Sequence, residues 1–198
     1  MSVSESAAAP GFADPVDDTQ QVFRRLLDAF AHPGRVVAVP ASLSPPPGLW
    51  PSAAALGFAL LDHSTSLFLD AALAREPILS YFRFHTGAPI ASLPAAAGFA
   101  LIGDPTGLDL TVFAQGEAER PERSATVIVQ VEGFEGADAV RLTGPGIKKS
   151  TALKVAGIDA ALWRQWRENA ALYPCGVDLV FAAPEAVVAL PRAVRVEI

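Results

Sequence analysis

The stretch ATVIVQVE, residues 125–132, predicts a β-strand that is buried on both faces. It is dominated by β-branched residues, which favour extended structure, and apolar side chains occur at successive positions. A strand of this kind is typical of the interior of a parallel or mixed sheet that has other layers packed on both sides. The stretch therefore predicts an α/β fold.

Helices and strands are expected to alternate on both sides of this strand. Helical periodicity and helix-end signals predict helices over residues 17–34 with Asp17 as the cap, 51–62, 76–87, 108–116 and, capped by Asp159, 160–172. The helix over 108–116 is expected despite its β-branched content. Short apolar runs predict strands over residues 35–39, 65–70, 98–103, 139–144, 151–157, 176–182 and 187–190. This alternation predicts a layered α/β sandwich with a largely parallel or mixed sheet.

The 198 residues fit one domain preceded by a short arm. Residues 1–11 show no periodic pattern and predict a flexible N-terminal arm. Residues 12–198 predict a single α/β domain, and the 51% hydrophobic content is enough for a sizeable core.

Charge and cysteine content exclude several classes of protein. The net charge of −6 makes the chain a poor general binder of nucleic acid, because such binding depends on neutralising phosphates. Its one cysteine, Cys175, permits neither an internal disulfide nor a cysteine-based zinc cluster, which suits a reducing compartment. The longest uncharged run, residues 36–61, contains five prolines and cannot be a membrane helix. We expect a cytoplasmic protein with no membrane or nucleic-acid partner.

The stretch RLTGPGIKKS, residues 141–150, supports two interpretations. In the first it is an anion-binding loop formed by Gly144, Gly146, Ile147, Lys148 and Lys149, in which backbone N–H groups and two ammonium groups surround the ligand. In the second it is a type II turn between two strands, with proline second and glycine third. It matches neither the Walker A nor the Rossmann pattern, and the proline lacks an N–H, so the residues favour the turn.

No catalytic constellation is predicted. The three histidines, His32, His63 and His85, lack the spacing of a metal site, and neither a metal nor a catalytic residue is expected. A pyridoxal phosphate enzyme needs a Schiff-base lysine. The only lysines are Lys148, Lys149 and Lys154, which cluster beside one turn with no second element of a cofactor site. We therefore expect no cofactor.

Several segments together resemble one protein family. They are FADPVDDTQQVFRRLLDAFAHPG, LGFALLD, FHTGAP, PERSATVIVQV, LTGPGI, NAALYPCGVDLVF and ALPRAV. Their order and spacing are similar, from about Phe12 to the C-terminus, to those of PhnH, the H subunit of bacterial carbon–phosphorus lyase.

The resemblance implies more than the residues predict alone. It implies a cytoplasmic homodimer with a three-layer α/β/α sandwich, similar to pyridoxal-phosphate-dependent transferases but without their cofactor site. It implies assembly with the G, I and J subunits. With the G, I and L subunits, the H subunit belongs to the step that exchanges the adenine of ATP for a phosphonate, giving a ribose 1-phosphonate 5-triphosphate. No catalytic residue is carried over from the family.

Three functions follow from these expectations. The chain is expected to be a structural or substrate-positioning subunit without catalytic residues of its own. The alternatives are a nucleotide- or phosphonate-binding subunit that uses GPGIKK, residues 144–149, and a stand-alone α/β enzyme.

Overall fold

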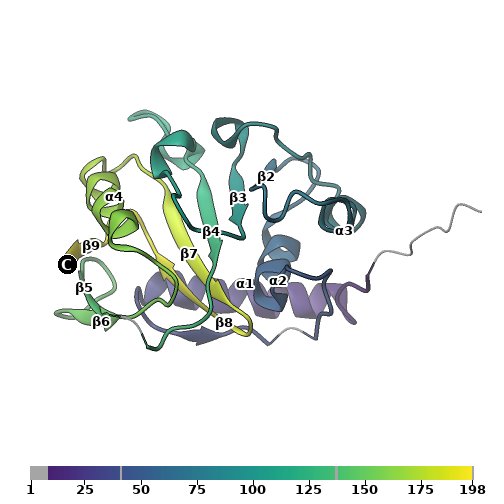
Figure 1. Cartoon of the computed structure of the whole chain (residues 1–198), viewed down its shortest axis with the longest axis horizontal. Helices are drawn as coiled ribbons and strands as arrows, with labels where there is room; N and C mark the ends of the chain where they lie inside the picture. The colour runs from purple at the N-terminus through teal and green to yellow at the C-terminus, as the bar shows by residue number, and fades with distance from the viewer. Residues whose placement is uncertain (1–8, 41, 137, 198) are drawn as a thin grey trace, which may run out of the picture.

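The computed structural model describes residues 9–40, 42–136 and 138–197. A mixed six-stranded sheet runs through the middle of the molecule, and a small second sheet lies at one end (Figure 1). The expected α/β class is confirmed.

The main sheet has the strand order β1-β8-β7-β4-β3-β2. Its strands are β1 (Val37–Ala38), β2 (Leu67–Leu69), β3 (Phe99–Ile102), β4 (Thr126–Gln130), β7 (Asp178–Ala183) and β8 (Ala186–Leu190). The neighbours β2, β3, β4 and β7 are parallel, and the hairpin partner β8 and the edge strand β1 pair antiparallel. The sheet is therefore mixed and largely parallel, as the sequence predicts.

Side chains of β4 alternate between two apolar clusters. Ile128 belongs to the cluster that includes the helices α1 (Pro15–Ala31), α2 (Pro51–Leu60) and α3 (Glu76–Thr86). Val127 and Val129 belong to the other cluster. Both faces of the strand are thus buried, which explains its continuous apolar sequence.

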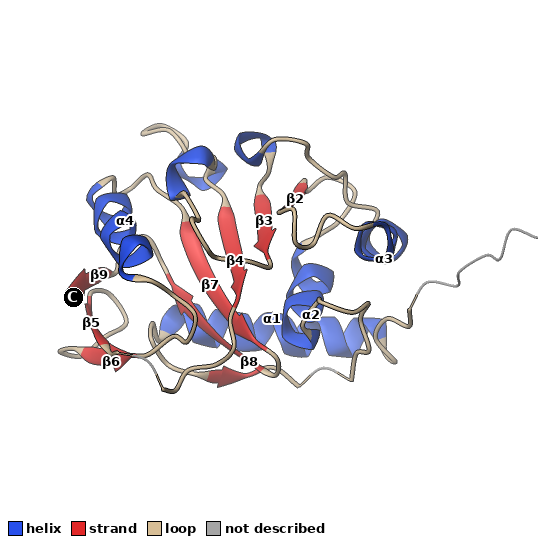
Figure 2. Ribbon diagram, in the orientation of Figure 1, coloured by secondary structure: helices blue, strands red, loops and turns tan. Residues whose placement is uncertain are grey.

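The second cluster is covered by α4 and the small sheet. This sheet is antiparallel and has the order β6-β5-β9, with β5 at Val140–Thr143, β6 at Thr151–Leu153 and β9 at Arg195–Glu197. Helix α4 (Ala160–Ala171) packs against β9, and its Trp166 is fully buried. Figure 2 shows α4 and the small sheet together at the end of the molecule opposite α3.

The first helix begins earlier than the sequence analysis predicts. Asp14, not Asp17, is the N-cap, and its carboxylate accepts hydrogen bonds from the N–H groups of Val16 and Asp17. Pro15 then occupies the first helical position, where its fixed φ suits a helix and its missing N–H costs nothing. The predicted cap Asp159 of α4 is confirmed, since its carboxylate accepts from the N–H groups of Ala161 and Leu162.

Two other predictions of elements are wrong. Residues 108–116 form only a 3₁₀ turn at Leu110–Val112, in agreement with their β-branched content. The strand predicted at 187–190 is present as β8, but it is not the last strand, because β9 follows it and pairs with β5. Two further 3₁₀ turns, Pro94–Ala96 and Pro121–Arg123, also lie in connections.

Ala9 and Pro10 of the N-terminal segment contact α3. The ring of His85 hydrogen-bonds through Nε2 to the Ala9 carbonyl at 2.8 Å, and the Tyr81 hydroxyl donates to the Pro10 carbonyl at 3.1 Å. Residues 1–8 of the predicted arm lie outside the described residues. Within the described ranges, no helix has the length and apolarity needed to cross a bilayer.

Candidate functional site

Residues 144–147 form the tight turn that joins β5 to β6. The Ile147 N–H donates to the Gly144 carbonyl at 3.1 Å, and Gly146 has a φ of 81°. A positive φ at the third position, after proline at the second, is what a type II turn requires. The turn interpretation of this stretch is therefore confirmed. Whether the surface of the turn also binds an anion is a separate prediction.

The turn is packed tightly against the end of α1. A Cβ added at Gly146 would lie 2.5 Å from the Ala31 carbonyl oxygen and 2.7 Å from Cδ of Pro33. At Gly34, which has a φ of 82°, a Cβ would lie 2.7 Å from Cδ1 of Leu142 on β5. These two Pro-Gly turns therefore fit against each other only because neither glycine has a side chain.

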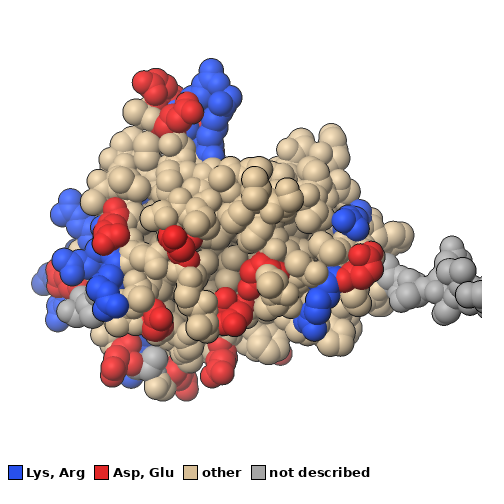
Figure 3. Space-filling view, turned by 45° about the horizontal axis from the view of Figure 1, so that its top comes forward, with Lys and Arg blue, Asp and Glu red and all other residues tan. Residues whose placement is uncertain are grey.

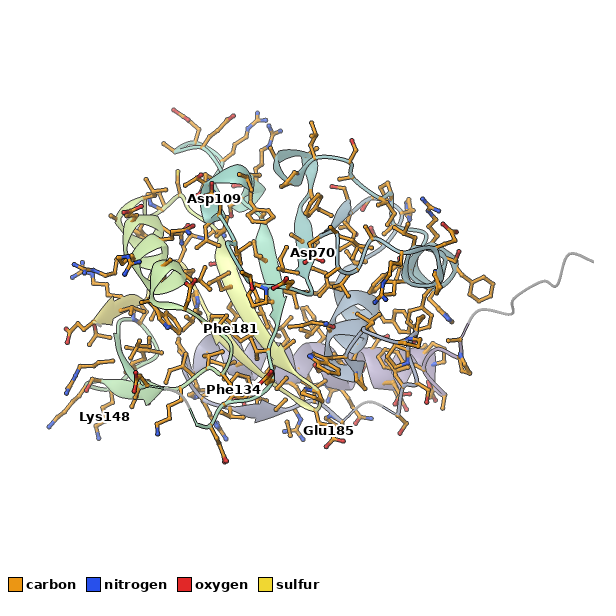
Figure 4. All side chains as sticks on the ribbon, viewed as in Figure 1. Asp70, Asp109, Phe134, Lys148, Phe181 and Glu185 are labelled. Carbon is orange, nitrogen blue, oxygen red and sulfur yellow. The ribbon has the colours of Figure 1, made fainter. Side chains whose placement is uncertain are left out.

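A surface hollow of about 460 Å³ lies beside the turn. Four basic side chains line it: Lys148 and Lys149 from the turn region, and His32 and Arg35 from the segment after α1. Lys148 lies at the outer edge of the molecule (Figure 4). We call this surface the Lys148 hollow, and it brings together residues more than 100 positions apart in the sequence.

One carboxylate partly neutralises the Lys148 hollow. Asp28 Oδ1 lies 3.0 Å from His32 Nδ1 and 3.5 Å from Arg35 NH1. Within the described part of the chain, neither Lys148 nor Lys149 has a carboxylate within 4.0 Å. The charge available to an anion therefore comes mainly from the two lysines, which are solvent-exposed.

The turn itself uses one of the predicted backbone donors. The Ile147 N–H closes the turn, so it is not available to a ligand. The N–H groups of Gly146 and Lys148 have no hydrogen-bond acceptor among the described residues. The arrangement provides two ammonium groups and two N–H groups at an open surface, which suits a phosphate or carboxylate more than an enclosed reacting substrate.

Ligands of α/β proteins often bind at the carboxyl end of the parallel strands. Here the polar side chains at that end form hydrogen bonds with the backbone of neighbouring loops. Asp70, after β2, accepts from the N–H groups of Gly103 and Asp104 at 3.0 and 2.9 Å. Gln130, at the end of β4, donates to the Gly48 carbonyl at 2.9 Å and accepts from the Trp50 N–H at 2.7 Å. Both side chains therefore hold loops, a role that their isolated positions in the sequence do not reveal.

The perturbed ionisable groups lie outside the Lys148 hollow. Hydrogen bonds from neighbouring Ser or Thr residues lower the pKa of three turn carboxylates: Asp62, Asp104 and Asp109. Burial raises the pKa of Tyr81 to about 12. Among the described residues, no group of three or more His, Cys, Asp or Glu side chains could hold a metal ion.

Sequence reasoning missed His32 and Arg35 as neighbours of the lysines. The contact depends on β5 and β6 lying against the end of α1, which is a long-range packing effect without a local pattern. The two Pro-Gly pairs, at 33–34 and 145–146, were visible in the sequence, but nothing there indicates that they touch.

The fold and the site define an α/β protein with a basic surface hollow beside a strand-joining turn. The chain belongs to the PhnH family of bacterial phosphonate metabolism proteins, whose family model matches residues 10–197. It is 35% identical over 198 residues, all of this chain and 99% of the relative, to the alpha-D-ribose 1-methylphosphonate 5-triphosphate synthase subunit PhnH of Rhizobium meliloti (strain 1021). It is also 35% identical over 182 residues, 90% of this chain and 86% of the relative, to the putative C-P lyase subunit protein HtxG of Stutzerimonas stutzeri.

Proposed function

We propose that this chain is a subunit of alpha-D-ribose 1-methylphosphonate 5-triphosphate synthase in the carbon–phosphorus lyase pathway of phosphonate use. The observation that carries the proposal is the match along the whole of both chains to the Rhizobium meliloti subunit. A match of this extent includes every strand of both sheets, so it concerns the complete fold rather than one motif.

The role proposed within the synthase is structural or substrate-positioning. The polar groups at the carboxyl end of the main sheet hold loops. In the open, basic Lys148 hollow, neither Ser150 nor Thr151 has a side-chain hydrogen bond to His32 or to a lysine among the described residues. Such a surface can orient an anion or a partner chain. The chemistry would then depend on other subunits.

Complementation tests this function directly. The gene is placed in a bacterium that lacks its own H subunit, with methylphosphonate as the phosphorus source. Growth together with co-purification of the remaining synthase subunits supports the proposal. A chain that is expressed and folded but neither restores growth nor co-purifies contradicts it, and growth on inorganic phosphate is the control.

A second candidate function is anion binding by the Lys148 hollow within the same complex. The observation that favours it is the convergence of His32, Arg35, Lys148 and Lys149 on one surface. A phosphonate or triphosphate would then contact Gly146 and the two lysines, whereas Gly144 of the loop predicted from the sequence does not line this hollow. In the structural alternative, the same residues form only the turn and its solvated rim.

The partners proposed are a second copy of the chain and the G, I and J subunits. Helix α1 supports the homodimer, because Val16, Phe23 and Leu27 on one of its faces remain 65%, 42% and 51% exposed. Asp17 and Arg24 lie seven residues apart beside this stripe, so antiparallel pairing of two α1 helices would place opposite charges together. Stable homodimers bury on the order of 2,000 Å² or more.

The third function, a stand-alone enzyme that uses pyridoxal phosphate, receives less support. Lys148, Lys149 and Lys154 are all solvent-exposed, whereas a Schiff-base lysine needs an enclosing cofactor site. Borohydride treatment that left a pyridoxyl-lysine adduct would establish it. The expected likeness to pyridoxal-phosphate-dependent transferases is retained as a prediction about the fold, and the cytoplasm is the proposed compartment.

A further inference from the structure

A second hollow lies between the end of α4, β9 and the far side of the 144–147 turn. It has two overlapping parts of about 600 and 520 Å³, which share Thr143, Ala170, Tyr173 and Arg195. Hollows of this size accommodate small molecules. We call it the Tyr173 groove, and residues 144 and 145 of the turn separate it from the Lys148 hollow.

A buried hydrogen bond brings together the two backbone segments that carry the arginines of the groove. The indole N–H of Trp166 donates to the Val194 carbonyl at 3.0 Å, which joins α4 to the residue before β9. The residues that follow on each side, Arg167 and Arg195, both line the groove. The core beneath therefore sets the backbone positions of two exposed arginines that come from different elements, and both side chains line the groove.

The aromatic residue of the groove is carried by a restrained loop. Buried Asn169 donates to the Val177 carbonyl at 2.9 Å and accepts from the Val177 N–H at 2.8 Å, so the loop between them is tied back to α4. Tyr173, in this loop, is 64% exposed. Within the described ranges its ring stacks on no other aromatic ring and its hydroxyl forms no hydrogen bond.

The groove has a positive net charge. Among the described residues, neither Arg167 nor Arg195 has a carboxylate within 4.0 Å, whereas Arg192 is paired with Asp178. One acidic side chain, Glu197, lines part of the groove, and it lies 3.8 Å from Nε of Arg141. Two free guanidinium groups therefore outweigh one carboxylate that already has a cationic neighbour.

We propose that the Tyr173 groove binds a polyphosphate attached to a ring, as in nucleoside and sugar polyphosphates. A guanidinium group can donate two parallel hydrogen bonds to two oxygens of one phosphate. Arg167 and Arg195 therefore hold the phosphates. The exposed ring of Tyr173 stacks against the base or the sugar, and Thr143 adds a hydroxyl. This inference rests on the proposed function, because the product named for the Rhizobium meliloti relative carries ribose and triphosphate in one molecule.

Calorimetric titration of the purified full chain tests the site with ATP, AMP and inorganic tripolyphosphate. We expect ATP to bind about tenfold tighter than tripolyphosphate because of the stacked ring. AMP should bind about tenfold weaker than ATP, because it presents fewer charges to the arginines. CTP replaces ATP in a fourth titration. If CTP and ATP bind with equal affinity, the stacking is assigned to the shared ribose, and if CTP binds more weakly, it is assigned to the base. Both outcomes support the groove.

Substitutions then locate the site. Arg195→Gln and Tyr173→Leu should each weaken ATP binding by about tenfold, since each removes one charge-assisted or stacking contact. Tyr173→Leu should leave the affinity for tripolyphosphate unchanged. Arg164→Gln is the matched control, because Arg164 is an exposed arginine on α4 that lines neither part of the groove. All three side chains are at the surface, so circular dichroism and thermal melting should match those of the parent chain.

Three results would overturn the inference. They are no ATP binding at millimolar concentration, equal affinity for ATP and tripolyphosphate in the parent chain, and loss of binding in a Lys148→Ala/Lys149→Ala variant while Arg195→Gln and Tyr173→Leu retain it. The last result would move the ligand to the Lys148 hollow. A chain that restores growth on methylphosphonate without binding ATP refutes this site alone, whereas failure to restore growth refutes the proposed function.

Discussion

At the scale of single residues, Gly146 has two separate reasons to be glycine. Its φ of 81° is strained for any side chain, and a Cβ would also lie 2.5 Å from the Ala31 carbonyl oxygen. Gly157 also has a φ of 81°, but a Cβ there would meet no atom within 4 Å. Gly157 has the backbone strain without the steric overlap, and Gly146 has both. Comparing the two glycines therefore separates these two effects within one protein.

We predict that Gly157→Ala lowers the free energy of unfolding by about 1 kcal/mol, the cost of a left-handed alanine. Gly146→Ala should lower it by about 3 kcal/mol or more, because the turn must also move away from α1. Urea denaturation of the two variants measures both values. Equal losses of unfolding free energy in the two variants would mean that the turn can move away from the Ala31 carbonyl without a free-energy cost.

The lysines beside this turn should matter little to folding. We predict that Lys148→Ala/Lys149→Ala changes the free energy of unfolding by less than about 0.5 kcal/mol, since both side chains are exposed and unpaired within the described residues. If the turn is only structural, the variant also grows on methylphosphonate like the parent. Loss of growth with assembly intact would instead favour the anion-binding function, and Lys154→Ala is the control.

Tyr81 should make the protein sensitive to alkali. Burial favours its neutral form and raises its pKa to about 12, from 10.0 in the unfolded chain. The folded state therefore retains this proton longer, so its contribution to stability is complete below pH 10 and is lost as the pH rises towards 12. Urea unfolding of the parent and of Tyr81→Phe between pH 9 and 12 measures the effect. A parallel decline of both proteins would assign it to other groups.

At the scale of elements, α1 presents two apolar faces. Val22, Leu26 and Ala29 are buried against the sheet, whereas Val16, Phe23 and Leu27 face outward. A helix needs only one apolar face to pack on its own domain. The second, outward face is therefore available for the proposed homodimer, and substitutions in α1 alone can test this.

We predict that Leu27→Asp converts a dimer to a monomer in light scattering at micromolar concentration. A charge buried in a helix pair lacks a partner and costs more than the contact contributes. Gln21→Asp, exposed on the same helix outside the stripe, should leave the mass unchanged. A parent chain that is monomeric under these conditions contradicts the homodimer itself.

The sequence predicted elements where the signal is local and missed them where it is not. The double-sided apolar run of β4, the cap at Asp159 and the turn at 145–146 each depend on neighbouring residues, and all are present. Strand β9 has only three residues and exists because β5 pairs with it. For the same reason, the joining of Lys148 with Arg35, and of Arg167 with Arg195, depends on tertiary packing that no local pattern encodes.

At the scale of the whole molecule, charge is divided unevenly. The chain has 21 Asp and Glu against 15 Lys and Arg, yet residues 140–172 contain six Lys and Arg against two Asp and Glu. Figure 3 shows basic side chains gathered at the end that carries α4 and the small sheet. The acidic total therefore argues against nucleic acid as a partner, while this end retains the charge needed for a small anion.

The two sheets should unfold as one unit. They are joined by the short connection from β8 to β9. One apolar cluster also contains side chains of both sheets: Val127 and Leu179 of the main sheet, and Leu142, Leu153 and Val196 of the small sheet. Neither sheet can lose its packing without exposing the apolar surface of the other. This connection predicts a single domain over residues 12–198.

We predict coincident urea transitions by far-ultraviolet circular dichroism and by tryptophan fluorescence in a Trp50→Phe variant. That variant retains Trp163 and Trp166, which report on the packing of α4 alone, whereas circular dichroism reports on every helix. Trp50 lies at the start of α2 and packs against the cluster of α1 to α3, so the substitution removes the signal from that side. A fluorescence transition at lower urea than the circular dichroism transition would show that α4 and the small sheet unfold separately, and the chain would then consist of two cooperative units.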